Sequence, residues 1–144
     1  MPNLKDLARL DAPRLTDAGL LFMRVAAALL LLCVHGLPKL LNWSAELQRI
    51  EDPFGIGPGL TLGMAVFAEV LCPLLLILGI GARLACLPVL AVLLVALVVV
   101  HPDWTLEQGQ FAWLLLALYG GLAITGPGEF SLAARIGREG RAAR

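Results

Sequence analysis

Apolar residues fill this chain in blocks that are too long for the core-facing stripe of a soluble helix. The first block runs from residue 19 to 41, and about 20 apolar residues suffice to cross the hydrocarbon core of a bilayer. The next block, 60–100, is far too long for one crossing, and GIGAR at 79–83 interrupts it with glycines that permit a tight turn. The pattern therefore predicts membrane-spanning helices at about 19–41, 60–80 and 84–101.

A shorter apolar block predicts a fourth helix at about 110–125, which ends at the helix-breaking GPG of 126–128. Short connections between successive spans favour antiparallel neighbours. The expected fold is therefore all-α, an antiparallel four-helix transmembrane bundle. Four short helices are expected to enclose little space, and no inverted repeat is visible. Solute or lipid transport by a single chain is accordingly the least favoured function.

Composition agrees with a membrane protein and excludes several other classes. Apolar residues make up 59% of the 144 residues and charged residues only 15%, with a mean hydropathy of +0.85. The formal net charge is zero and no basic aromatic patch is present, which argues against a nucleic-acid partner. The three cysteines form no CxxC pair, so neither a zinc site nor a thioredoxin-like motif is predicted. Hydrolase and kinase motifs are absent as well.

Lysine and arginine residues gather on one side of the predicted spans, and this bias sets the orientation of a membrane protein. The richer side is cytoplasmic, so we expect a multi-pass protein of the bacterial inner membrane with both termini in the cytoplasm. The predicted organisation is a cytoplasmic segment 1–18, a membrane domain 19–126 and a basic cytoplasmic tail 127–144. The cytoplasmic side carries Lys5, Arg9, Arg14, Arg83, Arg135, Arg138, Arg141 and Arg144, whereas the outer side carries only Lys39 and Arg49.

Two segments outside the spans have a helical spacing of apolar residues. In the first outer loop, Trp43, Leu47, Ile50 and Phe54 recur every three or four residues, which predicts a short amphipathic helix on the outer leaflet. A weaker pattern of apolar residues between 130 and 136 predicts an inner counterpart. Its arginines would face anionic headgroups.

Ionisable residues inside the spans are the candidate site, because charges at bilayer depth are costly and usually face the interior in pairs. Arg24 and His35 are eleven residues apart, which places them on one helix face about 16 Å apart. Glu69 is expected between their levels, within reach of Arg24, with His101 near the depth of His35. Such a column either binds a ligand or merely fixes helix packing. We expect Lys39 to extend toward the outer headgroups.

Four sequence elements together resemble the DoxX family of small bacterial membrane proteins, over most of the chain from Gly19 to Ala133. They are LLFMRVAAALLLLCVHGLPKLL with its arginine and His-Gly-x-x-Lys ending, FAEVLCPLLLILGIGARLACL with its glutamate, His101 at the end of the third helix, and GPGEFSLAA. Two positions depart from the family pattern. Cys72-Pro73 stands where a glycine pair is frequent, and Ala133 stands where an acidic residue is frequent.

The resemblance implies a four-helix membrane protein linked with quinone-dependent sulfur oxidation or with thiol-based stress defence. The polar positions that match the family are Arg24, His35, Lys39, Glu69, Arg83 and His101. We therefore expect an accessory or redox-linked subunit, more readily a partner of an oxidoreductase than an enzyme alone. It would bind a quinone-like or other small hydrophobic ligand at these residues, whereas a bis-histidine haem is less favoured. The alternative is a non-enzymatic scaffold or assembly factor, and a homo-oligomer is compatible with either.

Overall fold

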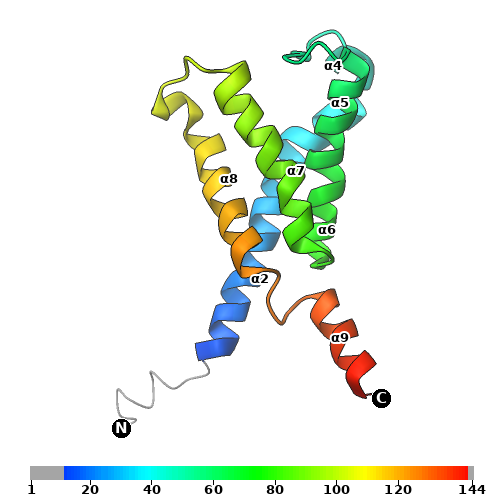
Figure 1. Cartoon of the computed structure of the whole chain (residues 1–144), viewed down its shortest axis with the longest axis vertical. Helices are drawn as coiled ribbons and strands as arrows, with labels where there is room; N and C mark the ends of the chain where they lie inside the picture. Colours follow the sequence, from blue (N-terminus) through cyan, green and yellow to red (C-terminus); the bar gives the residue numbers. More distant parts are fainter. Residues whose placement is uncertain (1–11, 143–144) are drawn as a thin grey trace.

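The computed structural model describes residues 12–142, and this part of the chain is all-helical, with no β-strand (Figure 1). Most of it forms four long helical segments. The first three each contain a π-helical turn. The first segment is α2 (Ala12–Leu31), η1 (Leu32–Gly36) and α3 (Leu37–Leu41), and the second is α5 (Pro58–Val66), η2 (Phe67–Leu71) and α6 (Cys72–Leu78). The third is α7 (Ala82–Val95) and η3 (Ala96–Val100), and the fourth is α8 (Leu106–Thr125).

Three of these segments are long and apolar enough to cross a membrane. They cover Pro13–Leu41, Pro58–Leu78 and Ala82–Val100, close to the three spans that the sequence predicted. The first begins before the predicted 19, because α2 continues back to Ala12. The fourth segment has 20 residues and begins before the predicted 110, at a capping box formed by Thr105 and Gln108. Polar residues in its first turns lower its hydropathy, so its membrane crossing stays a prediction.

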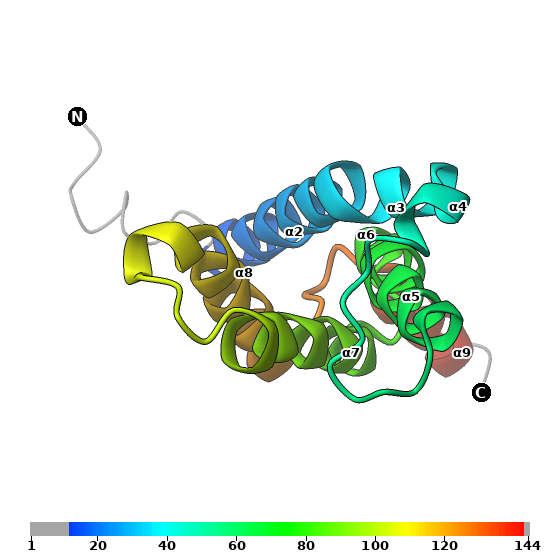
Figure 2. The ribbon, with the colours of Figure 1, turned by 90° about the horizontal axis from the view of Figure 1, so that it is seen from above.

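The four segments contact one another in a ring. The first packs against α6 and α8, and α7 also packs against α6 and α8 (Figure 2). Small and aliphatic side chains fill the interior, and the Tyr119 hydroxyl donates a hydrogen bond across it to the Ala27 carbonyl at 2.9 Å. Cys72 and Cys86 are buried in this core, whereas Cys33 is exposed. The fully buried core residues include Ala28, Leu62, Leu76, Val89 and Leu115.

The connection between α6 and α7 is a tight turn that depends on glycine. Gly79 ends α6 with φ 71° and Gly81 precedes α7 with φ 56°, both in the left-handed region that glycine adopts without strain. A Cβ on Gly79 would also lie 2.5 Å from the Ser131 Cβ, because the segment after α8 packs against this turn. The predicted break at GIGAR is therefore confirmed, and the chain after residue 126 lies at the same end of the molecule.

The predicted amphipathic helix of the first outer loop is wrong in its extent. Only one helical turn forms, α4 (Trp43–Glu46), followed by turns and irregular chain to residue 57. The later part of the loop is held by Asp52, whose carboxylate accepts hydrogen bonds from the amides of Ile56 (3.1 Å) and Gly57 (2.7 Å). It also accepts one from the Thr61 hydroxyl at 2.8 Å. Such a side-chain turn favours non-helical chain after Asp52.

Candidate functional site

A cavity of about 520 Å³ lies between the four segments, in the half of the molecule away from the α6–α7 turn. The 42–57 loop, which the sequence predicts on the outer side, and the 101–108 region border it. Most of its wall is apolar, from side chains such as Leu31, Met64, Val92, Leu93, Phe111 and Leu115. Four predicted site residues also line it: His35, Lys39, Glu69 and His101. The expectation that four helices enclose little space is therefore wrong for this chain.

All three π-helical turns border this cavity. η1 contains His35, η2 contains Glu69, and η3 ends at Val100 with His101 as its cap. A π-turn widens the helix by one residue and re-aims the side chains around it, and such turns recur at functional sites. Two of the three turns carry the ionisable cavity residues His35 and Glu69, and the third ends beside His101.

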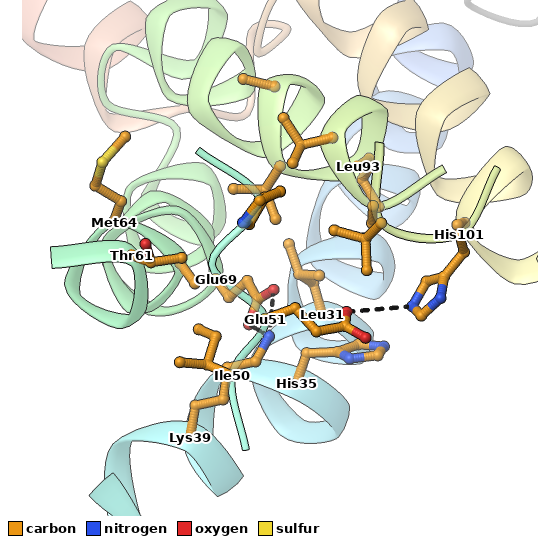
Figure 3. Close-up of a pocket in the computed structure, with 18 of the residues that line it drawn as sticks. Leu31, His35, Lys39, Ile50, Glu51, Thr61, Met64, Glu69, Leu93 and His101 are labelled. Carbon is orange, nitrogen blue, oxygen red and sulfur yellow. Dashed lines mark hydrogen bonds and ion pairs between the residues drawn. The ribbon is translucent and has the colours of Figure 1, made fainter. Parts of the chain in front are cut away.

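Lys39 and Glu69 form an ion pair at the cavity wall (Figure 3). The Lys39 Nζ lies 2.7 Å from Glu69 Oε1 and 2.5 Å from Oε2, and only 6% of the Glu69 side chain is exposed. Gly36 permits this register, because the backbones of η1 and η2 approach so closely there that a Cβ on Gly36 would lie 2.1 Å from the Glu69 carbonyl oxygen. Lys39, one turn later, faces Glu69 rather than the headgroups, so the predicted orientation of Lys39 is wrong.

The two histidines line the cavity from different helical segments, and each stacks on an aromatic ring. The His35 ring lies 5.8 Å from the Phe111 ring of α8, and the His101 ring lies 3.9 Å from Trp104. His101 Nε2 is 4.0 Å from a carboxylate oxygen of Glu51, which links the first outer loop to the end of η3 (Figure 3). His35 is the closer of the two to the ion pair, one turn before Lys39 on the same helix.

Arg24 is not part of this site, and the predicted Arg24–Glu69 pair is absent. Its guanidinium donates hydrogen bonds to the carbonyls of Pro127 and Phe130, the latter at 2.9 Å. Glu69 lies level with Gly36, twelve residues and therefore about 18 Å along the helix from Arg24. An arginine side chain cannot span that distance. Arg24 is nonetheless almost fully buried, with 1% exposed, and it serves the opposite end of the molecule.

The outer loop supplies cavity residues that sequence reasoning did not assign to the site. Glu46, Arg49 and Glu51 line it, together with apolar side chains at Ile50 and Phe54. The helical spacing of Ile50 and Phe54 marked this segment as having an apolar face, and both side chains border the cavity. Gly36 belongs to the His-Gly-x-x-Lys ending that resembles the family, and nothing in the local sequence signals its contact with Glu69.

The hydrogen bonds of the Asp52 carboxylate hold this loop, and their contribution to the stability of the fold should depend on pH. The Thr61 hydroxyl bond, followed by the backbone amides, lowers the pKa of Asp52 below its ordinary 3.8. When the pKa of a carboxyl group is lower in the folded state than in the unfolded state, its ionised form stabilises the fold. This stabilisation is complete at pH values above the unfolded-state pKa. That stabilisation is lost as the pH falls below 3.8 through the folded-state value.

We therefore expect Asp52→Asn to lower the thermal unfolding midpoint at neutral pH and to abolish this pH dependence. The difference between wild type and variant should shrink as the pH falls from about 7 to about 2.5, measured by thermal unfolding in detergent. Asp103→Asn, an exposed aspartate of the next connection on the same side, is the matched control. A difference that stays constant over the whole range would contradict the role of Asp52.

Chemically, the cavity offers an apolar chamber with a few polar groups at one wall. Lys39 donates hydrogen bonds, Glu69 accepts them, and the imidazole of His35 can do either. Pockets of this composition bind small molecules with an apolar body and a polar head. Among residues 12–142, no group of three or more His, Cys, Asp or Glu side chains is arranged to hold a metal ion.

The comparisons with known proteins identify the family. Neither the curated proteins nor the solved structures contain a significant match. The family model described as DoxX matches residues 19–102, which include most of the first apolar span, the whole of the second and third, the π-turns and the cavity residues His35, Lys39, Glu69 and His101. The matched range is more than half of the 144 residues. This chain therefore belongs to the DoxX family.

Proposed function

We propose that the protein binds a small hydrophobic molecule with a polar head, of the quinone type, in the cavity between its helices. The observation that supports this most directly is the Lys39–Glu69 pair at the wall of a cavity that is otherwise largely apolar. A buried ion pair that served packing alone would not need an open chamber beside it. In this proposal the protein is an accessory or redox-linked subunit, and its partner supplies the redox chemistry.

Each polar group of the cavity would make a different contact with the head of the ligand. Lys39 would donate to a carbonyl oxygen of the head, Glu69 would accept from a hydroxyl, and His35 would exchange a proton with it. The apolar wall would hold the ring and the start of a tail. His101, with Glu51 and Trp104, would border the ligand where the outer loop meets η3. Arg24 has no part in binding.

We further propose the membrane arrangement that the charge distribution favours. All four segments cross the inner membrane as an antiparallel bundle, and both termini face the cytoplasm. The cavity then lies in the outer half of the bilayer, where a lipophilic ligand is abundant and can enter sideways between the helices. Arg83 at the start of α7 and the arginines of the C-terminal tail support this orientation through the positive-inside rule.

Glu69→Gln tests the ligand site directly. With a decyl-substituted benzoquinone as the probe and the protein in nanodiscs, quenching of tryptophan fluorescence reports binding, because Trp104 lines the cavity. We expect affinity to fall roughly tenfold, about the value of one charge-assisted hydrogen bond. Glu107→Gln, on the exposed first turn of α8, should leave it unchanged. The same affinity in wild type and Glu69→Gln would refute the site.

The scaffold alternative rests on the close approach of Gly36 to Glu69, which makes the ion pair a candidate helix clamp. Replacing both Lys39 and Glu69 by leucine distinguishes a helix clamp from a ligand-binding pair. Buried ion pairs replaced by apolar residues of similar size often retain stability. If the pair only clamps the helices, the double variant should fold and assemble like wild type. If the pair binds a ligand, the double variant should fold and lose the probe.

A further inference from the structure

The C-terminal helix α9 (Leu132–Ala142) presents a face that the rest of the described chain leaves exposed. Leu132 and Ile136 are four residues apart and share one side of the helix, and 63% of Ile136 is exposed. Arg135 and Arg138 are three residues apart and share another side, with side chains 74% and 61% exposed. Figure 1 shows α9 running away from the long segments rather than packing along one. An apolar stripe beside a basic stripe is the pattern of a helix that lies on a membrane.

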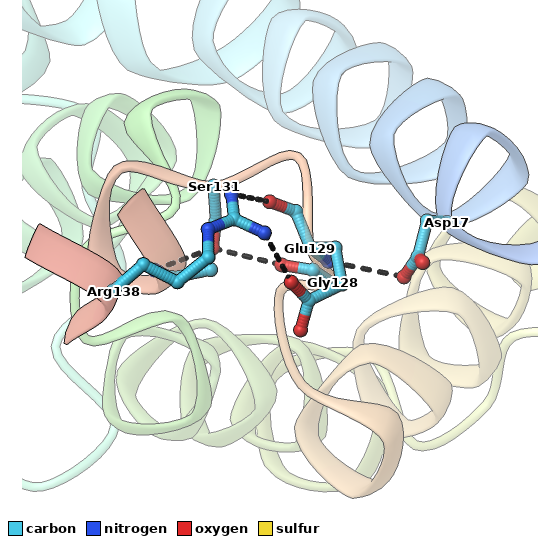
Figure 4. A network of polar contacts seen from close by, with 6 residues as sticks. Asp17, Gly128, Glu129, Ser131 and Arg138 are labelled. Atoms are coloured by element: carbon cyan, nitrogen blue, oxygen red, sulfur yellow. Dashed lines mark hydrogen bonds and ion pairs between the residues drawn. The ribbon is translucent and has the colours of Figure 1, made fainter. Parts of the chain in front are cut away.

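The start of α9 is fixed at one level of the molecule. Arg24 donates hydrogen bonds to the carbonyls of Pro127 and Phe130. In Figure 4, the Asp17 carboxylate accepts a hydrogen bond from the Glu129 amide, at 3.0 Å. The Ser131 hydroxyl then caps the helix by accepting from the Ala134 amide at 3.2 Å. Ser131 packs against the α6–α7 turn at Gly79, where two apolar spans end. The helix therefore begins where the hydrocarbon core gives way to headgroups.

The helix needs a surface to be stable. It has 11 residues, and isolated helices of that length are marginal in water. Gly137 and Gly140 lower its stability further, and a Cβ at either position would meet nothing within 4 Å. Arg138 pairs with the exposed carboxylate of Glu129 and also donates to the Glu129 carbonyl at 3.4 Å, and Arg135 pairs with the exposed carboxylate of Glu139. Such exposed pairs contribute little, so a phosphate group can replace the carboxylate.

We propose that α9 lies on the leaflet at this end of the protein and that Arg135 and Arg138 bind the headgroups of anionic phospholipids. Leu132 and Ile136 then insert at the boundary of the acyl chains. The occupant is a lipid surface because the capped start of α9 places it at headgroup depth, where its two stripes meet an apolar layer and an anionic one. This inference does not depend on the cavity ligand and survives if the proposed function fails.

The test uses the full chain in vesicles, with an environment-sensitive fluorophore on Ile136→Cys. Cys33→Ala removes the exposed thiol, and the burial of Cys72 and Cys86 protects them from a bulky label, which the Cys33→Ala protein alone verifies. We expect blue-shifted emission and quenching by lipid-borne quenchers in vesicles of phosphatidylcholine with phosphatidylglycerol. Phosphatidylcholine alone should give a weaker response. A label on Leu106→Cys, at the start of α8, should not respond to the added anionic lipid.

Arg135→Gln with Arg138→Gln should weaken the membrane-bound state of α9 about fivefold per arginine, as expected from roughly 1 kcal/mol per charge near an anionic surface. Identical emission in both kinds of vesicle would overturn the proposal. So would a buried label that is indifferent to the arginine substitutions, since the apolar stripe alone would then suffice. Emission that depends on the protein-to-lipid ratio would assign the face to a second copy and would also overturn it.

Discussion

Gly36→Ala should separate the first and second helical segments and lower the stability of the protein by about 3 kcal/mol or more. The added methyl group would lie 2.1 Å from the Glu69 carbonyl oxygen and 2.7 Å from the carbonyl carbon. Both are backbone atoms of a π-turn, so no side-chain rotation relieves the clash. The helices must move apart, and the Lys39–Glu69 pair, one turn away, must lengthen with them.

The matched control is Gly63→Ala, one turn before η2 in the same second segment. A Cβ on Gly63 meets nothing within 4 Å, so alanine there should stabilise the helix by up to about 1 kcal/mol. Thermal unfolding of both variants in detergent measures the contrast, and probe binding measures the change in the cavity. Equal unfolding midpoints for the two variants would show that the crossing at Gly36 can relax, contrary to this expectation.

The membrane spans could be predicted because each depends only on local composition. An apolar block of sufficient length and a glycine turn specify a helix end without reference to the rest of the fold, and the GIGAR turn is found where predicted. The same reasoning from local pattern did not predict the extent of the helix in the 42–57 loop. Its residues do have helical spacing, but the helix ends at Glu46, and the loop is held further on by the Asp52 carboxylate, which accepts from two backbone amides and a hydroxyl. No periodicity of apolar residues reveals such contacts.

Which ionisable residues line the cavity could be predicted from the sequence, but which of them pair could not, because pairing depends on the register between helices. The cost of burying charge predicts that ionisable residues face the interior, and His35, Glu69 and His101 do line the cavity, whereas their role in binding stays a prediction. Their partners depend on how one helix slides along another. That offset is set by the Gly36 contact with the Glu69 backbone, which assigns Lys39 rather than Arg24 to Glu69. The three π-turns also change the direction of the side chains around them, and none of these turns has a recognisable sequence signal.

The two buried charges that the sequence suggested as one pair thus stabilise opposite ends of the protein. Glu69 neutralises Lys39 beside the cavity, whereas the partners of Arg24 among residues 12–142 are carbonyl oxygens and no carboxylate. Two helices, α6 and α8, end near it, at Gly79 and Gly126. The carbonyl ends of helices carry partial negative charge, which compensates a buried cation in the absence of a carboxylate. This explains how an arginine with 1% exposure persists in an apolar chain.

Arg24→Met should consequently release the segment after α8 while leaving the cavity intact. Methionine fills much of the volume but donates no hydrogen bond, so the Pro127 and Phe130 carbonyls lose their charged partner. Two bonds of this kind are worth about 3–5 kcal/mol together. We expect a lower unfolding midpoint and faster hydrogen exchange at the amides of Glu129 and Ala134, measured by mass spectrometry. Probe binding in the cavity should change little in the protein that stays folded.

Arg83→Met is the control that distinguishes a buried anchor from a general need for positive charge at this end. Arg83 is exposed, and its guanidinium reaches the Thr125 carbonyl only at 3.4 Å, so the loss of that contact should cost less than about 1 kcal/mol. Hydrogen exchange at Glu129 and Ala134 should then match wild type. If both variants release the segment equally, the positive charge at this end rather than the buried contact of Arg24 holds it, and α9 would depend on the membrane surface for its position.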